Sequence, residues 1–445
     1  MPILPSPPDT IPGSRRVPLE VVYLIMESFI SQFNTGRSET CNSAAIPFSR
    51  PSSTKELLRL RLICKSWAKL IPKLAFHTIH LPTPRSVESI VKYCRDSHLD
   101  SILSPVRRLS IEKIVYWDPL GVENPDEGLP GFRRDLDELE IFNFTFVPVL
   151  MHHATELIET IGQNLTDLTF KFTNSMGFSP ELIGAIKQIK CLKKLYISRL
   201  GNIPPGSNND SKSLVEILNT TPSLESLTIY FDDLEILHLE PQALPRLRHL
   251  WFDIQEGNTE AISHLCKATK DSLKAIEYIT SDDQDVRILI EPLKDNLEYL
   301  FTEMFSNHFL NDLSEITFPK LRVTRCFTWW IALDFEDTPT LAWLQRPIFK
   351  TIRTLVTDLR GAKEYWQTAL ENLGDDVLTK PPNLKHFIFI DRLGDHSISD
   401  EPLVRSFKSH GIQCHFVSNL TYEEILVRMG LEAQWAHEMS TSTCL

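Results

Sequence analysis

A short apolar pattern recurs along most of the chain and predicts a series of strands. It reads L-x-x-L-x-(apolar), as in 192–197 (LKKLYI) and 224–229 (LESLTI). The clear copies begin at Val106, Leu165, Leu192, Leu224 and Leu247, and weaker ones begin at Leu273, Leu297, Leu321, Ile352 and Leu384. From Leu165 onward the starts are 27, 32, 23, 26, 24, 24, 31 and 32 residues apart. A unit that returns at such steps indicates a repeat architecture.

Helical stretches fill several intervals between these strands. Apolar residues recur at helical spacing in 180–189, 213–218 and 259–266. A strand and a helix in every step of about 20–30 residues resemble the leucine-rich repeat, whose parallel strands line a concave face and whose helices cover the convex one. We therefore expect an α/β fold with a leucine-rich-repeat solenoid, shaped as a horseshoe, over residues 101–420. A last strand is expected at 412–417, and a capping helix and tail at 421–445, with the helix at 422–437.

The array departs from the regular form of that family. The position of the family's Asn/Cys ladder holds Thr173, Leu200, Asp232 and Gln255 in the four cleanest copies. We expect an irregular array whose register depends on leucine packing, with inserted loops at 116–131 and 201–210.

Two amphipathic helices are predicted before the repeats. The first follows Pro18, and its apolar face consists of Val22, Ile25, Met26, Phe29, Ile30 and Phe33. The second opens with Ser53 and Glu56 at the spacing of a capping box, and Pro72 ends it. Its apolar face consists of Leu57, Leu60, Ile63, Cys64, Trp67 and Ile71. Between the helices, the polar, turn-rich residues 34–52 predict a flexible surface insert.

Residues 15–80 resemble the F-box. The resemblance rests on 17–22 (VPLEVV) with Ile25, and on 60–67 (LRLICKSW) followed by 70–71 (LI). It implies a helical hairpin that binds a Skp-type adaptor and, through it, the cullin scaffold of an SCF ubiquitin ligase. The positions that it places at the adaptor interface are Pro18, Glu20, Ile25, Ile63, Cys64 and Trp67. Two features depart from the family, namely the long insert at 34–52 and Val17 where Leu is usual. The alternative is that Trp67 and its neighbours only form the core of a hairpin packed on the rest of the chain.

Charge is distributed unevenly along the 445 residues. The net charge is -12, whereas residues 15–75 carry ten basic and four acidic side chains. The negative net charge of the whole chain disfavours non-specific binding to nucleic acid, because such binding depends on lysines and arginines that neutralise phosphates. The acidic remainder suggests, as a hypothesis, that the repeats bind a basic ligand surface.

The ends and linkers complete the expected organisation. Residues 1–14 are proline-rich without the pattern of a secretory signal, so we expect a disordered tail and a cytoplasmic or nuclear protein. Residues 81–100 are expected to form a linking helix. No apolar run approaches the roughly 18 residues of a membrane span, so no membrane contact is expected.

The sequence offers little catalytic chemistry. It contains no G-x-x-x-x-G-K-[ST], G-x-G-x-x-G or G-x-S-x-G motif, and the eight cysteines include no C-x-x-C pair. His437-Glu438 lacks the second histidine of a zinc motif, because position 441 is Thr. We therefore expect no catalytic residue, no metal site and no cofactor.

Aromatic residues near the predicted strands are candidate contacts for a protein target. We select Tyr230, Trp251, Trp329 and Trp330. Consecutive strand residues face opposite ways, so Trp329 and Trp330 cannot both enter one core. For any single aromatic residue, the alternative is that it fills the core.

Taken with the resemblance, these features imply a substrate-recognition subunit of an SCF-type cullin E3 ubiquitin ligase. The hairpin would bind the adaptor, and the repeats would bind an unidentified protein target. The alternative is a repeat-built scaffold or regulatory protein that never enters a ligase. An enzyme with an unrecognised site is a third, weaker hypothesis, and it would require a polar pocket with perturbed titratable groups on the concave face.

Overall fold

The computed structural model divides into two compact units. Unit 1 comprises Met1–Gly36 and Pro47–His77, and unit 2 comprises Arg37–Ile46 and Thr78–Leu445. The structure describes residues 58–62, 67–68, 71, 74–96, 105–115, 149–172, 178–199, 209–231, 233–280, 286–302, 313, 316–325, 342–358, 363–371, 383–390 and 401–417.

Unit 1 contains a small apolar cluster of its own. Ile71 and Ala75 are buried, and the partly buried Leu58, Leu60, Trp67 and Leu74 pack against them. A short 3-10 helix, η1 (Leu60–Leu62), lies in this region. The cluster includes Leu60, Trp67 and Ile71, three residues of the apolar face predicted for the second helix. The other predicted adaptor contacts, Pro18, Glu20, Ile25, Ile63 and Cys64, lie outside the described residues, as do the predicted 1–14 tail and 34–52 insert.

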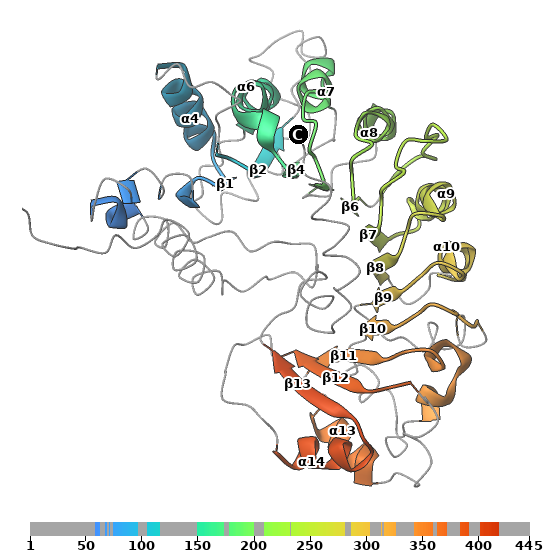
Figure 1. Cartoon of the computed structure of the whole chain (residues 1–445). Coiled ribbons are helices and arrows are strands. Elements are labelled where there is room, and N and C mark those ends of the chain that lie inside the picture. Colours follow the sequence, from blue (N-terminus) through green and yellow to red (C-terminus); the bar gives the residue numbers. More distant parts are fainter. Residues whose placement is uncertain are drawn as a thin grey trace, which may run out of the picture. The chain divides into compact units, whose positions relative to one another are not determined.

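Unit 2 is built on one parallel sheet whose strands follow the chain order (Figure 1). Each strand pairs in parallel with the next, except that the short β3 pairs with β2 and β4 takes the next place along the sheet. The strands are β1 (Thr78–Leu81), β2 (Arg108–Val115), β3 (Val149–Leu150), β4 (Asp167–Phe172), β5 (Lys194–Arg199), β6 (Ser226–Tyr230), β7 (His249–Ile254), β8 (Ala275–Thr280), β9 (Tyr299–Thr302), β10 (Val323–Arg325), β11 (Thr354–Asp358), β12 (His386–Ile390) and β13 (Gln413–Val417).

Helices connect many of the strands and lie on the outer side of the curved sheet (Figure 1). The α-helices are α4 (Pro84–Asp96), α6 (Met151–Ile161), α7 (Pro180–Lys187), α8 (Asn209–Thr220), α9 (Thr259–Thr269), α10 (Arg287–Ile290), α13 (Lys363–Glu371) and α14 (Glu401–Ser409). The 3-10 helices of this unit are η4 (Gly162–Asn164), η5 (Glu291–Leu293), η6 (Ala342–Gln345) and η7 (Pro347–Phe349). The described part of the chain is thus an α/β solenoid like that of leucine-rich-repeat proteins.

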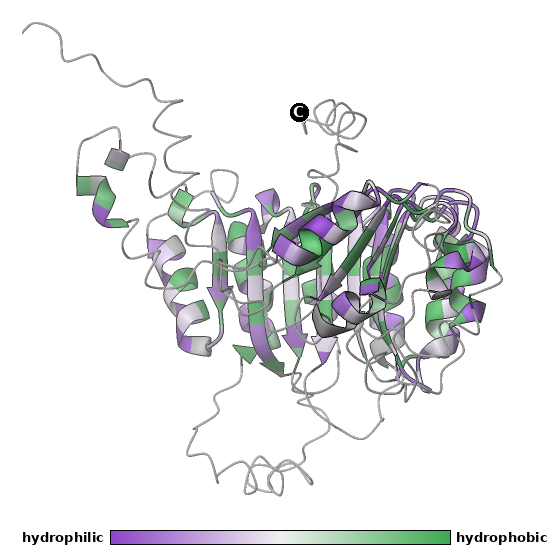
Figure 2. Cartoon of the chain, turned by 90° about the horizontal axis from the view of Figure 1, so that it is seen from below, coloured by the Kyte–Doolittle hydropathy of each residue, from purple (hydrophilic) through white to green (hydrophobic). Residues whose placement is uncertain are grey.

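The apolar positions of the repeat pattern form a continuous core between sheet and helices. Leu168, Leu195, Leu227 and Leu250 are consecutive cross-strand partners, and each is at most 1% exposed. Along β4, buried and half-buried residues alternate, and Figure 2 shows the corresponding alternation of hydrophobic and hydrophilic residues along strands. Since the pleat sends alternate side chains to opposite faces, each strand buries one face against the outer layer of helices and connectors and leaves the other on the inner side of the curve.

A repeated backbone contact holds successive repeats in register. The carbonyl of the residue before each strand accepts the N–H groups of the equivalent residue and its successor in the next repeat. Arg248 O, for example, accepts from Lys274 N at 2.9 Å and from Ala275 N at 2.8 Å. The same pair of bonds is made by Arg107, Thr166, Lys193, Glu225, Lys274, Glu298, Arg322 and Arg353. These pre-strand residues therefore line up along one edge of the sheet, which we call the pre-strand edge.

The structure confirms all ten strands predicted from the repeat pattern, and the last strand, β13, within the predicted 412–417. It corrects the start of the array. The solenoid begins at Thr78 rather than at residue 101, because β1 pairs in parallel with β2, and the helix expected as a linker is α4 of the array. Residues 76–81 (FHTIHL) carry apolar side chains at the three pattern positions, but Phe76 and Ile79 stand where the pattern has leucine, so β1 was not predicted. The predicted loop at 116–131 and the helix at 422–437 lie outside the described residues.

Candidate functional site

The inner face of the sheet, opposite the helices, carries the candidate site. Its character changes along the solenoid. Charged and hydroxyl side chains occupy β1 to β5, a polar network and an aromatic pair occupy β6 to β8, and apolar side chains occupy β8 to β13. These three regions are described in turn.

A carboxylate flanked by two basic side chains lies on the first strands. Glu112 Oε1 is 3.3 Å from His80 Nε2 and 2.5 Å from Lys171 Nζ. The hydrogen bond with His80, together with the bond and charge of Lys171, outweighs the effect of burial and lowers the pKa of Glu112 to about 2. Burial raises the pKa of the neighbouring Tyr196, which stays a neutral phenol. This region therefore presents a fixed anionic group between β1 and β4.

A β-bulge on β2 follows directly after Ile111 and returns the strand to the core side at Ile114. The register between β2 and β4 shifts between Ile111 and Ile114, and Lys113 within the bulge has a φ of 60°. Ile111 and Ile114 are both fully buried, whereas Lys113 is exposed. If side chains simply alternated after Ile111, Lys113 would point into the core. The extra residue of the bulge places Ile114 in the core instead and leaves Lys113 in solvent.

We expect the contribution of Glu112 to stability to disappear in acid. Its pKa is depressed in the folded state, so the contribution is complete above the ordinary value of 4.5 and declines as the pH falls towards about 2. Glu112→Gln should lower the free energy of unfolding by about 1–2 kcal/mol at neutral pH, since part of the side chain is screened by solvent. Urea denaturation over a pH series measures this difference, which should shrink below pH 4.5.

Glu159→Gln is a matched control for this prediction, because Glu159 is exposed on the outer helix α6. Its difference from the wild type should be small at every pH. A Glu112→Gln deficit that stayed constant from neutral to acidic pH would contradict the assignment of the effect to the Glu112 charge.

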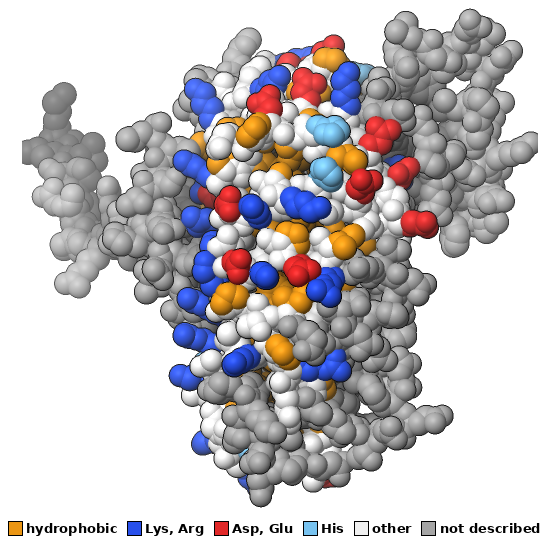
Figure 3. Space-filling view, turned by 90° about the vertical axis from the view of Figure 1, so that its right-hand side faces the viewer, with side chains coloured by type: hydrophobic (Ala, Val, Ile, Leu, Met, Phe, Trp, Pro, Cys, Tyr) orange, Lys and Arg blue, Asp and Glu red, His pale blue; other side chains and the backbone are white. Residues whose placement is uncertain are grey.

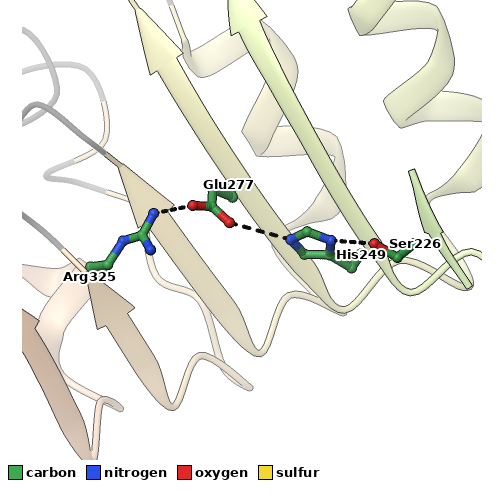
Figure 4. A network of polar contacts seen from close by, with 4 residues as sticks. All are labelled: Ser226, His249, Glu277 and Arg325. Carbon is green, nitrogen blue, oxygen red and sulfur yellow. Dashed lines mark hydrogen bonds and ion pairs between the residues drawn. The ribbon is translucent and has the colours of Figure 1, made fainter. Parts of the chain in front are cut away.

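A buried polar network crosses the middle of the inner face (Figure 4). Ser226 Oγ lies 2.8 Å from His249 Nδ1, and His249 Nε2 lies 3.5 Å from Glu277 Oε2. Arg325 Nη2 donates to Glu277 Oε1. The guanidinium carbon of Arg325 is 5.0 Å from the centroid of the Phe301 ring. None of the four network residues is more than 7% exposed.

The strand register explains how residues distant in sequence meet in this network. Ser226 and His249 are cross-strand partners on β6 and β7. Glu277 on β8 and Arg325 on β10 are both partners of Phe301, which lies between them on β9. The ion pair therefore spans two strand spacings across an aromatic ring.

The network contains a serine, a histidine and a carboxylate, the side-chain types of a hydrolytic triad. Its geometry nevertheless indicates a structural role. In such triads the carboxylate stabilises the imidazolium that forms when histidine takes the serine proton. Here Arg325 already neutralises that carboxylate, and Ser226 is buried. A buried, hydrogen-bonded set of charges that joins four strands instead fixes the pairing of repeats.

An aromatic pair beside the network includes two predicted target contacts. Tyr230, half-buried at the end of β6, and Trp251 on β7 stack with ring centroids 5.9 Å apart and planes inclined by 28°. Trp251 is only 4% exposed, so Tyr230 offers more surface to a partner. The binding roles of both residues remain predictions. Trp329 and Trp330 lie outside the described residues, so their predicted roles stay predictions as well.

A buried apolar cluster occupies much of the inner face of the last strands. Its eight side chains, from β8 to β13, are Ala275, Tyr299, Phe301, Val323, Val356, Ile388, Ile390 and Val417. Burial raises the pKa of Tyr299 beyond its ordinary range. The face becomes polar again at its end, where His386 Nδ1 on β12 lies 3.3 Å from His415 Nε2 on β13.

Sequence reasoning missed a side-chain clamp at Asn258, before α9. Its Nδ2 donates to Phe231 O, in the preceding repeat, and to Asp253 O at 2.8 Å, while its Oδ1 accepts from Gln255 N at 3.0 Å. Asn258 is 1% exposed. It stabilises the turn after β7 in the way expected of an asparagine of the Asn/Cys ladder. Asn258 lies three residues after Gln255, the ladder position expected from the repeat pattern. Among the described residues, no cluster of three or more His, Cys, Asp or Glu side chains could hold a metal ion, and no helix is long and apolar enough to cross a membrane.

Comparison with known proteins identifies no family for the chain. No family model matches it, and no curated protein matches it. Among solved structures, a chain of the crystal structure of the Rad7 and Elc1 complex in yeast is 12% identical, with 90% of this chain and 98% of that chain covered. Its TM-score is 0.32. At that score the likeness is too weak to support an argument about fold or function.

Proposed function

We propose that the chain is the substrate-recognition subunit of an SCF-type cullin E3 ubiquitin ligase. One observation carries the proposal: residues that resemble the F-box, ending with Cys64 and Trp67, lie directly before a solenoid of leucine-rich-repeat type. A module that attaches to a ligase and a surface that binds a target are the two parts that such a subunit needs.

The organisation of the chain supports this division of roles. Within the F-box-like segment 15–80, the described residues up to His77 belong to unit 1, whereas 78–80 belong to β1, the first strand of the solenoid. The apolar cluster around Trp67 consists of residues of unit 1. Leu62 is 81% exposed, and an exposed leucine in this position gives a Skp-type adaptor an apolar contact.

In this proposal the chain supplies no catalytic residue, metal or cofactor. The adaptor and cullin hold the ubiquitin-loaded enzyme, and the solenoid holds a protein target near it, so the rate gain comes from proximity. The protein would act in the cytoplasm or nucleus. The alternative remains a repeat-built scaffold that binds proteins without entering a ligase.

Co-purification with a Skp-type adaptor tests the proposal. We expect the full chain to retain the adaptor and Leu62→Arg to reduce recovery by about tenfold, because a charge at a packed apolar contact costs on the order of 1.4 kcal/mol or more. Ile288→Arg is the matched control. Ile288 is an exposed apolar residue of α10 in the solenoid, at 47% exposure, and its replacement should leave recovery unchanged.

A second variant, Trp67→Ala, tests whether the adaptor binds the F-box-like residues without contacting Leu62. Circular dichroism should first show that each variant is folded. If the wild-type chain recovers no adaptor, the ligase role is wrong and the scaffold alternative stands. If both variants keep the adaptor at the wild-type level, the F-box-like residues are not the attachment site.

A further inference from the structure

Basic side chains gather along the pre-strand edge of an otherwise acidic protein. Figure 3 shows lysines and arginines in a column along the left-hand side of the described surface. In the described segments directly before β10, β11 and β12 (316–322, 347–353 and 383–385), five side chains are cations and none is a carboxylate. They are Lys320, Arg322, Lys350, Arg353 and Lys385, which we call the basic edge.

The backbone ladder holds three of these cations on consecutive rungs. Arg353 N donates to Arg322 O at 2.7 Å, and Lys385 N donates to Arg353 O at 2.9 Å. Adjacent strands lie about 4.8 Å apart, so Arg322, Arg353 and Lys385 span about 10 Å. Lys320 and Lys350 lie a few residues earlier in the first two connectors and add two charges to the same edge. Like charges so close repel one another, and an anionic partner removes that repulsion.

The chain does not neutralise the basic edge within the described structure. Elsewhere on the pre-strand edge, Lys193 pairs with Glu225 at 3.2 Å and Lys274 pairs with Glu298 at 3.7 Å. No described carboxylate forms such a pair with any of the five residues of the basic edge. Lys320 donates instead to the amide oxygen of Asn296 at 2.9 Å. Lys320, Lys350, Arg353 and Lys385 are exposed, and Arg322 is half-buried.

We propose that the basic edge binds an extended acidic segment of a partner protein. Arginine offers a planar fork of donors that matches a carboxylate, and three rungs in line suit a chain that runs along the edge. This inference rests on the proposed function only for the statement that the repeats bind a protein target. It does not depend on the adaptor. It also reverses the hypothesis drawn from net charge, since the local surface is basic where the chain as a whole is acidic.

The composition of the edge favours a polypeptide over the other polyanions. Its apolar side chains Phe318, Leu321, Ile352 and Leu384 are buried, at 0 to 7% exposure. These segments thus offer no exposed aromatic ring on which a nucleic-acid base could stack, and Pro319 is their one exposed apolar side chain among the described residues, too little to insert into a lipid surface.

The test uses the purified full chain without an adaptor, so that a failure here is distinct from a failure of the ligase proposal. The probe is a fluorescent peptide of about twelve residues that alternates Glu and Ser, and binding is followed by anisotropy at about 0.15 M salt. In the test variant all five residues of the basic edge become glutamine. In the matched control, five exposed cations on the outer helices become glutamine: Arg85, Lys92, Lys212, Lys267 and Arg405. Both variants have the same net charge.

We expect the basic-edge variant to bind the peptide at least about tenfold more weakly and the control variant to bind it within about twofold of the wild type. Absence of peptide binding by the wild type, or equal losses in the two variants, would overturn the proposal. Tighter binding of an oligothymidylate of similar length, or of phosphatidylserine vesicles, would also overturn it and identify the partner as nucleic acid or membrane.

Discussion

Trp366→Ala is expected to lower the free energy of unfolding by about 3–5 kcal/mol, the usual cost of removing a large buried aromatic side chain. Trp366 lies on α13 and has no exposed surface. Its ring centroid is 5.1 Å from that of Phe387 on β12, 5.9 Å from that of Phe407 on α14 and 6.2 Å from that of Trp343 on η6. The Trp366 side chain thus packs α13 against β12, α14 and η6. Its removal leaves a cavity bordered by all of these elements.

The position of Trp366 near the end of the solenoid predicts which strands lose stability in Trp366→Ala. Repeats contact mainly their neighbours, so the terminal repeats can open while the others stay folded. Hydrogen exchange should rise over β11 to β13 and change little over β4 to β6. Glu371→Ala, an exposed change on the same helix, should alter stability by less than about 0.5 kcal/mol. Uniform loss of protection over all strands would show that the array unfolds as one cooperative unit.

Arg325→Ala is expected to cost about 3–5 kcal/mol, because it leaves the buried carboxylate of Glu277 without its strongest partner. Glu277 is 1% exposed, and its remaining contact in the network is His249 at 3.5 Å. Chemical denaturation measures the effect.

A double replacement separates the charge from the packing. Arg325→Met with Glu277→Leu removes both charges and should recover most of the stability lost in Arg325→Ala, because two apolar side chains can fill the space without desolvated ions. Arg353→Ala, an exposed arginine of the next connector, should have little effect on stability. A double variant as unstable as Arg325→Ala would show that the shape of the network, including the contact with Phe301, matters more than its charges.

The repeat pattern could be found from the sequence because it depends on local chemistry. Each L-x-x-L-x-(apolar) copy alternates residues for the two faces of a strand and so predicts both the strand and its core side. For this reason the ten predicted strands, the α/β class and the parallel order agree with the structure. The apolar face that includes Leu60, Trp67 and Ile71 was likewise visible from its helical spacing.

Sequence alone determined where the chain alternates between strand and helix, because periodicity records which side chains must be buried. Only the tertiary structure decided which side chains from different repeats meet. Glu277 and Arg325 lie 48 residues apart and meet through Phe301, and Asn258 reaches back across 27 residues to Phe231. The basic edge emerges in the same way, from charges in separate repeats that the backbone ladder aligns. Such contacts depend on the register between strands, and no periodicity within a single repeat contains that information.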